Sequence, residues 1–327
     1  MTASNTGRAT VPGARTAGIT VTRRDVTAGL HHLGIASGDL VFFHSSLKSM
    51  GHVEGGPDTV LDGFLDAVGE QGTVVVPAFK LTERIGPFGS WYDHETTPST
   101  VGLITETLRC RVDAVRSHHP THSVAAAGRL ALAVTAPHRA AFGRISPWCD
   151  AAFAHNSPFD LLARWDAWYV LLGVSFQVQT IMHYLETMLV DAVLRRATES
   201  DRPRLMASVR RWGGEGIWPA PDRTRLGEAL CARGVYARST IGQATVYGAR
   251  FQSVLLHALR LVMDAPQAWL ANEVVTWMGT PLNPARVLAE YTAPDGAPPL
   301  MIPAASYSCA GRSRDTQGKP VAQESLG

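Results

Sequence analysis

The sequence predicts an α/β fold, with a single layered domain in which a central mixed β-sheet is flanked by helices. Short apolar runs of β-forming residues alternate along the chain with segments whose apolar residues recur at helical spacing, as is typical of layered α/β domains. The chain has 327 residues, of which 45% are apolar, so a substantial core can form. We expect a disordered tail over residues 1–19, the main domain over residues 20–270, and a C-terminal extension and flexible tail over residues 271–327.

Composition and charge bound the class of protein. Lys and Arg number 30 against 28 Asp and Glu, for a formal charge of +2, so nothing favours nucleic acid or a membrane as partner. No apolar run approaches the span of a bilayer, and the N-terminus lacks the apolar core of a signal peptide. The four cysteines show no CxxC spacing. These observations predict a cytoplasmic protein without a structural zinc site.

The first elements follow the predicted alternation. TVTRRDVTAGLHHLGI predicts a helix, since Val26, Leu30 and Leu33 share one face. Thr22 suits its N-cap and Gly34 its end. The next segments predict, in order, a strand in GDLVFFHSS, a helix in GGPDTVLDGFLDAVGEQG, a strand in TVVVPAF, and a helix in STVGLITETLRCR that Ser99 would cap.

The second half of the chain contains a further strand and several helices. LLARWDAWYVLLGVS ends in an apolar run that predicts a buried strand, and TIMHYLETMLVDAVLRR predicts a helix. Between Asp222 and Leu270 two helical patterns dominate, TRLGEALCARG and YGARFQSVLLHALRLVMDAPQAWL. Trp269, Trp277 and Tyr291 are candidates to cover a cleft or to form a subunit contact.

His183 and Glu186 lie three residues apart in the predicted helix TIMHYLETMLVDAVLRR. One helical turn separates them, so the imidazole and the carboxylate share a face. A base and an acid on a helix that follows a buried strand are well placed for proton transfer. The same spacing is common in surface pairs, so other segments must decide between the two interpretations.

HSSLKSMGHVEGG lies between a strand end and a helix start, which is where α/β sheets bind ligands. Gly55 and Gly56 allow close backbone approach, and free amides at a helix N-terminus attract an anion such as a phosphate. Ser45 and Ser46 add hydroxyl donors. The spacing matches neither a Walker loop nor a dinucleotide fingerprint. An ordinary glycine-containing turn is the alternative.

RSHHPTHSVAAAG gathers Arg116 with His118, His119 and His122. Metal binding is one interpretation, but Pro120 interrupts helical spacing, and no Cys or carboxylate is interleaved. A catalytic or ligand-binding loop is favoured, because His titrates near neutral pH and the planar Arg fork can hold a phosphate or carboxylate.

WYDHETTPSTVG adds Asp93, an acid expected on an exposed loop. A nucleophile elbow of the GxSxG type occurs nowhere in the sequence, which argues against an α/β-hydrolase.

Taken together, these segments resemble the aminoglycoside 3-N-acetyltransferase family, also called the antibiotic N-acetyltransferase family. The resemblance covers roughly residues 20–270, and its pieces are weak singly but specific in collinear order. The matching pieces are HSSLKSMG followed by GG, GTVVVPAF, YDHETTPSTVG, RSHHPTHSVAAAG, NSPFDLLARWDAWYVLLGV, TIMHYLE and ARGVYARSTIGQATVYGARFQSVLLHAL.

The resemblance implies a single α/β catalytic domain with a mixed sheet. It also implies transfer of an acyl group from a coenzyme A thioester to an amine, without a covalent enzyme intermediate. The resemblance places the family's His-Glu pair on His183 and Glu186. It places the family's Arg-Ser-x-His-Pro segment on Arg116, Ser117, His119 and Pro120. The family's His-Ser-Ser loop, on the coenzyme A side of the cleft, falls on His44, Ser45 and Ser46.

Such a reaction needs a base, because an ammonium group is not a nucleophile, and it needs donors for the tetrahedral oxyanion. We expect His183 or His119 to be the base and Glu186 to orient it or share the proton; the sequence does not separate the two histidines. His122 is a further candidate catalytic residue. The residues expected to contact coenzyme A are His44, Ser45, Ser46, Gly55, Gly56, Arg116 and Ser117. Those expected to contact the acceptor are Phe79, Asp93 and Phe176.

Two departures from the family pattern concern the acceptor. GVSFQVQT carries Ser175, Phe176 and Gln177 where members usually have Gly and Asp or Asn, so this wall is bulkier and less acidic. Residues 187–216 carry six arginines against four acidic residues. A pocket lined by them would repel a polycation, whereas arginines that face solvent would not. We therefore hypothesise an acceptor other than a standard aminoglycoside.

The expected co-substrate is acetyl-CoA or another acyl-CoA, with an acyl carrier protein as alternative donor and a small-molecule amine as acceptor. We expect no metal, no nucleic acid and no membrane partner, and a homodimer is an open alternative. Two alternative hypotheses belong to other functional classes. One is a catalytically silent binding homologue. The other is a metal-dependent hydrolase that would use His118, His119, His122, His183 and Glu186.

Overall fold

The computed structural model describes residues 19–80, 92–141, 143–148, 150–209 and 216–297. Residues 1–18 of the tail predicted over residues 1–19, and the last thirty residues of the chain, lie outside this part. The described chain forms a seven-stranded mixed sheet, as predicted. In sheet order its strands are β5 (Ala114–Arg116), β6 (Val124–Gly128), β4 (Thr73–Pro77), β2 (Leu40–Ser45), β7 (Trp168–Leu172), β9 (Ala244–Arg250) and β8 (Ala237–Ile241).

The centre of the sheet is parallel. β2 pairs in parallel with β4 on one side and with β7 on the other, and the outer pairs are antiparallel. Every residue of β4 and β7 is buried, as expected for strands covered on both faces. Alternate side chains enter two separate cores: Phe42 and Tyr169 face one, and Phe43 and Val170 face the other.

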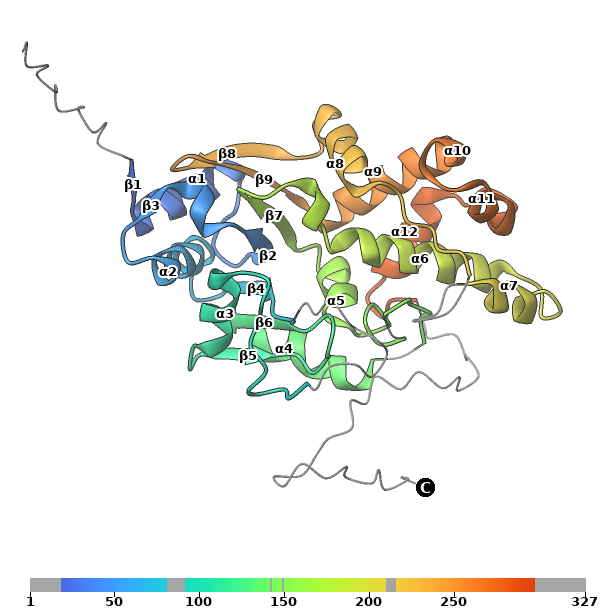
Figure 1. Cartoon of the computed structure of the whole chain (residues 1–327), viewed down its shortest axis with the longest axis horizontal. Coiled ribbons are helices and arrows are strands. Elements are labelled where there is room, and N and C mark those ends of the chain that lie inside the picture. The colour runs from blue at the N-terminus through green and yellow to red at the C-terminus, as the bar shows by residue number, and fades with distance from the viewer. Residues whose placement is uncertain (1–18, 81–91, 142, 149, 210–215, 298–327) are drawn as a thin grey trace, which may run out of the picture.

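Helices cover both faces of the sheet (Figure 1). One face packs against α1 (Arg23–Leu33), α2 (Pro57–Val68) and α3 (Leu103–Cys110). The other packs against α4 (Ala131–Thr135), α5 (Pro158–Arg164), α6 (Ile181–Arg196), α8 (Arg223–Ala232), α9 (Phe251–Asp264) and α12 (Pro284–Thr292). The remaining elements are α7 (Arg202–Ser208), α10 (Pro266–Trp269), α11 (Asn272–Met278), the 3₁₀ turns η1 (Leu47–Met50), η2 (Ala136–Ala140) and η3 (Phe176–Val178), and a small parallel pair of β1 (Thr20–Val21) and β3 (His52–Val53). Within the described residues, no helix is long and apolar enough to cross a bilayer.

Local signals correctly predicted the first helix. Thr22 caps α1 and forms a reciprocal capping box with Asp25. Gly34 ends the helix with φ of 99°, a left-handed conformation that glycine adopts without steric cost. Val26, Leu30 and Leu33 are buried, as their spacing predicted.

The helix expected in STVGLITETLRCR begins later than predicted. α3 starts at Leu103, with Gly102 as its N-cap, so Ser99 is not the cap. The Ser99 hydroxyl instead shares a hydrogen bond of 2.9 Å with the Thr105 hydroxyl, and its amide donates to the Glu106 carboxylate. These bonds fold the preceding turn back on the helix.

The β8–β9 hairpin was missed by the sequence interpretation. β9 occupies Ala244–Arg250, and α9 begins at the next residue, Phe251. Because no turn residue separates the strand from the helix, the apolar residues of both merge into one pattern, and YGAR was assigned to the helix.

The segment after residue 270 belongs to the main core. Val274, Met278 and Tyr291 are buried in the same apolar cluster as α5, α6 and α9. Tyr291, a candidate for covering a cleft or forming a subunit contact, does neither: its ring is fully buried and its hydroxyl donates to Asp191. Trp277 donates from its indole nitrogen to the carbonyl of Leu205, which ties α11 to α7.

A buried ionic cluster fixes the helices on this face. Arg144 is completely buried, and its Nη1 lies 2.7 Å from Oδ1 of Asp160 on α5 and its Nε 3.9 Å from Oδ2 of Asp191 on α6. Its guanidinium lies over the ring of Tyr291 on α12, with 4.7 Å to the ring centroid. Tyr184 on α6 donates to Asp160. A single side chain thus connects three helices.

We predict that Arg144→Met lowers the free energy of unfolding by about 3–5 kcal/mol, because it leaves buried carboxylates with less compensation. Tyr291→Phe removes one hydrogen bond to a charged group and should cost about 1.5–3 kcal/mol. Arg204→Met breaks an exposed pair with Asp201 and should leave the free energy of unfolding close to that of the wild type. Urea unfolding followed by circular dichroism gives the order; equal losses in Arg144→Met and Arg204→Met would contradict it.

Candidate functional site

Four loops meet at one edge of the sheet. The parallel strands β2, β4 and β7 all end there, at Ser45, Pro77 and Leu172. β5 runs in the same direction as β4, because both are antiparallel to β6, so the loop after Arg116 reaches the same edge. Ligands of open α/β sheets bind beyond the carboxyl ends of the strands. The polar loops singled out from the sequence therefore converge where a site is expected.

His183 lies on the first turn of α6, at this edge, and Glu186 lies one turn further. The His183 Nδ1 is 3.1 Å from the Glu186 Oε2, and the same oxygen accepts a hydrogen bond of 2.8 Å from the Trp218 indole nitrogen. Glu186 is 1% exposed. Since a carboxylate only accepts, the His183 Nδ1 carries the proton and its ring is held by Glu186.

The other ring nitrogen of His183 faces Arg223, the first residue of α8. The Arg223 Nη1 lies 3.0 Å from the His183 Nε2. A guanidinium has donors but no acceptor, so Nε2 is the acceptor in this contact. Both nitrogens of His183 are thus engaged, one by a carboxylate and one by a cation.

Aromatic rings form the wall around His183. The centroid of its ring is 4.0 Å from that of Trp148 and 6.0 Å from those of His122 and Phe153. The His183 side chain is 16% exposed, so the imidazole is accessible although largely enclosed. Such a wall excludes water from one side of the ring.

His119 and His122 lie deeper than His183. The His119 Nδ1 accepts hydrogen bonds from the backbone amides of Thr121 and His122, and its ring stacks on His138 at 4.7 Å. Burial lowers the pKa of His119 to about 3, and it also lowers the pKa of His122 well below its usual value. Both imidazoles are therefore neutral near pH 7 and hidden from solvent.

Arg116 and Ser117 were expected to contact coenzyme A, and the structure uses both inside the protein instead. The Arg116 guanidinium is buried and donates to the carbonyls of Ala78, His94 and Thr97. The Ser117 hydroxyl is fully buried and accepts from the Val124 amide. The donors of Arg116 stabilise the loop, so they are not presented to a phosphate.

The last two residues of β2 face opposite sides of the sheet. His44 is buried against Phe42 and Tyr169, with its Nε2 3.5 Å from the amide of Thr180, just before α6. Burial lowers the pKa of His44 to about 3. Ser45 points the other way, towards α2 and α3. Of this adjacent pair, only Ser45 lies where it could touch a ligand on that side.

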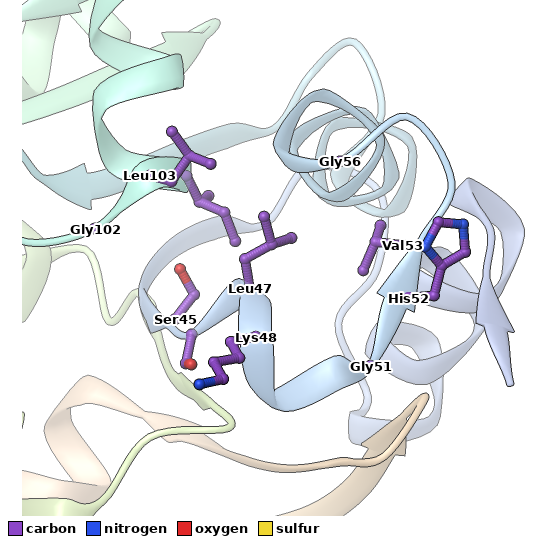
Figure 2. Close-up of a pocket in the computed structure, with 11 residues that line it drawn as sticks. Ser45, Leu47, Lys48, Gly51, His52, Val53, Gly56, Gly102 and Leu103 are labelled. Carbon is purple, nitrogen blue, oxygen red and sulfur yellow. The ribbon is translucent and has the colours of Figure 1, made fainter. Parts of the chain in front are cut away.

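A pocket of about 550 Å³ opens beside Ser45. Figure 2 shows Leu47 and Leu103 at this pocket, with the start of α2 at Gly56 nearby. The Ser45 hydroxyl is buried and has no hydrogen-bond partner among the described residues. The other lining residues are Ser46, Lys48, Gly51, His52, Val53, Gly102 and Ile104.

Two helices begin at this pocket, α2 after Gly56 and α3 after Gly102. Free backbone amides and the helix dipoles favour an anion at such positions. Lys48 is exposed at the rim and adds a positive charge. Gly55 does not line the pocket; at its φ of 74°, an added Cβ would meet the Thr59 hydroxyl at 2.6 Å. Its role is to shape the turn.

The three expected acceptor contacts lie in different places. The Phe79 ring is 5.5 Å from that of His122, on the His183 side. Asp93 accepts hydrogen bonds from the Glu95 and Thr96 amides and forms a local turn. Phe176 packs on Tyr236 and Tyr247. Of the three, only Phe79 contacts a residue of the aromatic wall around His183, namely His122.

The described arginines between residues 187 and 209 form their contacts away from His183. Arg195 pairs with Asp191, Arg196 with Glu290 and Arg204 with Asp201, while Arg202 donates to helix-end carbonyls. Arg210 and Arg211 lie outside the described residues. The positive charge at the site comes from Arg223 instead, which was not foreseen.

Arg223, Trp148 and Trp218 were all missed by the sequence interpretation. None belongs to a motif, and each reaches His183 or Glu186 only through the folded chain. The candidate metal ligands do not assemble either: within the described residues, no three His, Cys, Asp or Glu side chains are placed to share an ion.

Known proteins resemble this chain in sequence. Residues 42–262 match the profile of the family described as aminoglycoside 3-N-acetyltransferase. Aminoglycoside N(3)-acetyltransferase VII of Streptomyces paromomycinus is 30% identical over 78% of this chain and 93% of its own length. Aminoglycoside N(3)-acetyltransferase VIII of Streptomyces fradiae is 31% identical over 60% of this chain and 71% of its own.

Solved structures share the fold. The apoenzyme of aminoglycoside acetyltransferase AAC(3)-IVa superposes with a TM-score of 0.61 at 22% identity, over 80% of this chain and 95% of that one. AAC-IIIb in its binary complex with CoASH superposes with a TM-score of 0.58 at 20% identity, over 75% and 97%. From the family profile and the relatives, the chain belongs to the aminoglycoside 3-N-acetyltransferase family and is an acyl-coenzyme A-dependent N-acyltransferase.

Proposed function

We propose that this protein transfers the acetyl group of acetyl-CoA directly to an amine of a small, antibiotic-like or biosynthetic molecule, with His183 as general base. The observation that carries the proposal is the setting of His183: a buried carboxylate holds its Nδ1, its side chain is partly exposed, and it lies at the edge of the sheet where the polar loops converge. The family relatives named above, which are N-acetyltransferases, support an amine as the acceptor group.

The proposed step follows from the protonation of these groups. The Nε2 lone pair of His183 takes a proton from the acceptor ammonium, and Glu186 stabilises the resulting imidazolium. The amine nitrogen then attacks the thioester carbon, and the carbon–sulfur bond breaks. The nitrogen gives up its second proton to solvent, and the leaving thiolate takes up the proton from His183, giving an N-acetyl product, coenzyme A and one released proton.

The choice of His183 over His119 rests on access and bonding. His119 is buried, its Nδ1 already accepts two backbone amides, and its pKa is held at about 3. An imidazole with so low a pKa is a weak base at neutral pH. His122 is likewise buried, and its neutral ring lies beside His183 as part of the wall.

For acetyl-CoA we propose the pocket beside Ser45. Coenzyme A is a polyanion with a long, partly apolar arm, and the pocket offers two helix starts, Lys48 and the apolar side chains of Leu47 and Leu103. The buried, unpartnered Ser45 hydroxyl would then gain a hydrogen-bond partner from the ligand.

Replacing the proposed base should abolish turnover. His183→Ala is expected to lower kcat by about 10²- to 10⁴-fold, as loss of general-base catalysis does. Glu186→Gln should lower kcat in the same direction, because the amide no longer stabilises the imidazolium. Thiol release from acetyl-CoA measures both, and His32→Ala on the exposed side of α1 is the control. Wild-type rates in both site variants would refute the assignment.

Reversing the charge at the proposed donor pocket should weaken acetyl-CoA binding. Lys48→Glu is expected to raise the KM for acetyl-CoA about 3- to 10-fold, since an exposed charge contact contributes up to about 1 kcal/mol. Arg129→Glu makes the same charge change at the opposite edge of the sheet, after β6, and should leave KM unaltered. Equal KM changes in both variants would count against the pocket.

The buried histidines should make the fold sensitive to acid. His44 and His119 have pKa values of about 3 when folded and an ordinary value near 6.5 when unfolded. Below pH 6.5 the unfolded chain therefore binds protons at these histidines and the native state does not, so the free energy of unfolding falls as the pH falls. At pH 5.5 each site should cost about 1 kcal/mol relative to pH 7.5.

Urea unfolding at the two pH values tests this expectation. His44→Asn removes one buried titrating group and should lose less stability between pH 7.5 and 5.5 than the wild type does. His32→Ala removes an exposed imidazole and should behave as the wild type. A wild-type stability that is unchanged between the two pH values would contradict the assignment of neutral buried rings.

A further inference from the structure

Arg223 occupies the place that the reacting amine must reach. Its Nη1 lies 3.0 Å from the His183 Nε2, whose lone pair would accept the amine's proton. A base whose lone pair accepts from a guanidinium cannot at the same time accept from a substrate ammonium in that position. Arg223 must therefore move away from His183 before catalysis.

The guanidinium of Arg223 has no counter-ion in the described part of the chain. Its side chain is half-buried, and the only side-chain contact found for it there is the neutral Nε2 of His183. Glu186 is not the counter-ion of Arg223, because its Oε2 lies on the opposite side of the imidazole and accepts hydrogen bonds from His183 and Trp218. Neighbouring arginines are treated differently: Arg195 and Arg196 each have a carboxylate partner.

A guanidinium that uses one of its five donors on a neutral nitrogen has the rest available for a stronger acceptor. A carboxylate or phosphate binds it through two parallel, charge-assisted hydrogen bonds. A second ammonium group of a polycationic acceptor would instead be repelled at this position. The site therefore discriminates by the charge next to the reacting amine.

Building on the proposed function, we infer that the acceptor carries an anionic group, a carboxylate or a phosphate, close to the amine that is acetylated, and that Arg223 binds it. In binding this anion, Arg223 leaves the His183 Nε2, which then becomes available to the amine. Arg223 is thus both a specificity residue for the acceptor and the group that keeps the base occupied until the correct acceptor arrives.

Matched amino sugars test the inference through thiol release from acetyl-CoA. Glucosamine has no anion, glucosamine 6-phosphate adds a phosphate, muramic acid adds a carboxylate, and neamine adds further ammonium groups. The wild-type kcat/KM should be at least 10-fold higher for one of the two anionic sugars than for glucosamine or neamine. Which of the two is preferred distinguishes phosphate from carboxylate.

Arg223→Gln should lower kcat/KM for the preferred anionic sugar about 10- to 100-fold, as the loss of charge-assisted hydrogen bonds does. It should raise kcat/KM for glucosamine, because the lone pair of His183 is released. Arg225→Gln is the matched control, since Arg225 lies on the same helix, stacks on Trp269 and makes no contact with His183. Preference for neamine in the wild type, or equal losses for all sugars in Arg223→Gln, would overturn the inference.

A binding measurement separates this inference from the proposed reaction. Isothermal titration calorimetry of the protein with glucosamine 6-phosphate and with muramic acid needs no turnover. If an anionic sugar binds more tightly than glucosamine, and this preference is lost in Arg223→Gln but kept in Arg225→Gln, the inference is supported. If at the same time no acceptor releases thiol, only the proposed function is refuted. Turnover without any preference for anionic sugars would support the proposed function and refute the inference about Arg223.

Discussion

The placement of α6 depends on the buried guanidinium of Arg144. This side chain, with Asp160, Asp191 and Tyr291, joins α5, α6 and α12 in a region from which water is excluded. Ionic contacts of this kind are directional and costly to leave incomplete, so they hold α6 in one position where apolar packing alone would allow sliding. His183 and Glu186 are carried on the same helix, and their geometry at the sheet edge follows from that constraint.

Much of the architecture could be predicted from local patterns. The central strands are uninterrupted apolar runs, α1 is bounded by Thr22 and Gly34, and the collinear motifs indicated the family. These features depend on residues near one another in the chain. The pair of His183 and Glu186 was predicted for the same reason, because helical spacing alone places the two side chains on one face.

What escaped prediction depends on contacts between distant residues. Arg223 follows His183 by forty positions, and Arg144, Asp191 and Tyr291 lie on a loop and two different helices. Nothing in the sequence distinguishes a guanidinium that binds backbone carbonyls, as Arg116 does, from one that faces a cleft, as Arg223 does. Nor does the sequence indicate that polar atoms of His119 and Ser117, two motif residues, form hydrogen bonds within their own loop.

Strand β2 ends in two neighbouring side chains on opposite faces of the sheet, with His44 against the start of α6 and Ser45 in the pocket beside α2 and α3. On the proposed function, the two substrates would approach that strand end from different sides and meet there without sharing an entrance. Neither product would then have to depart before the second substrate enters. Such an arrangement corresponds to a ternary complex and a sequential rate law, with double-reciprocal plots that intersect instead of running parallel.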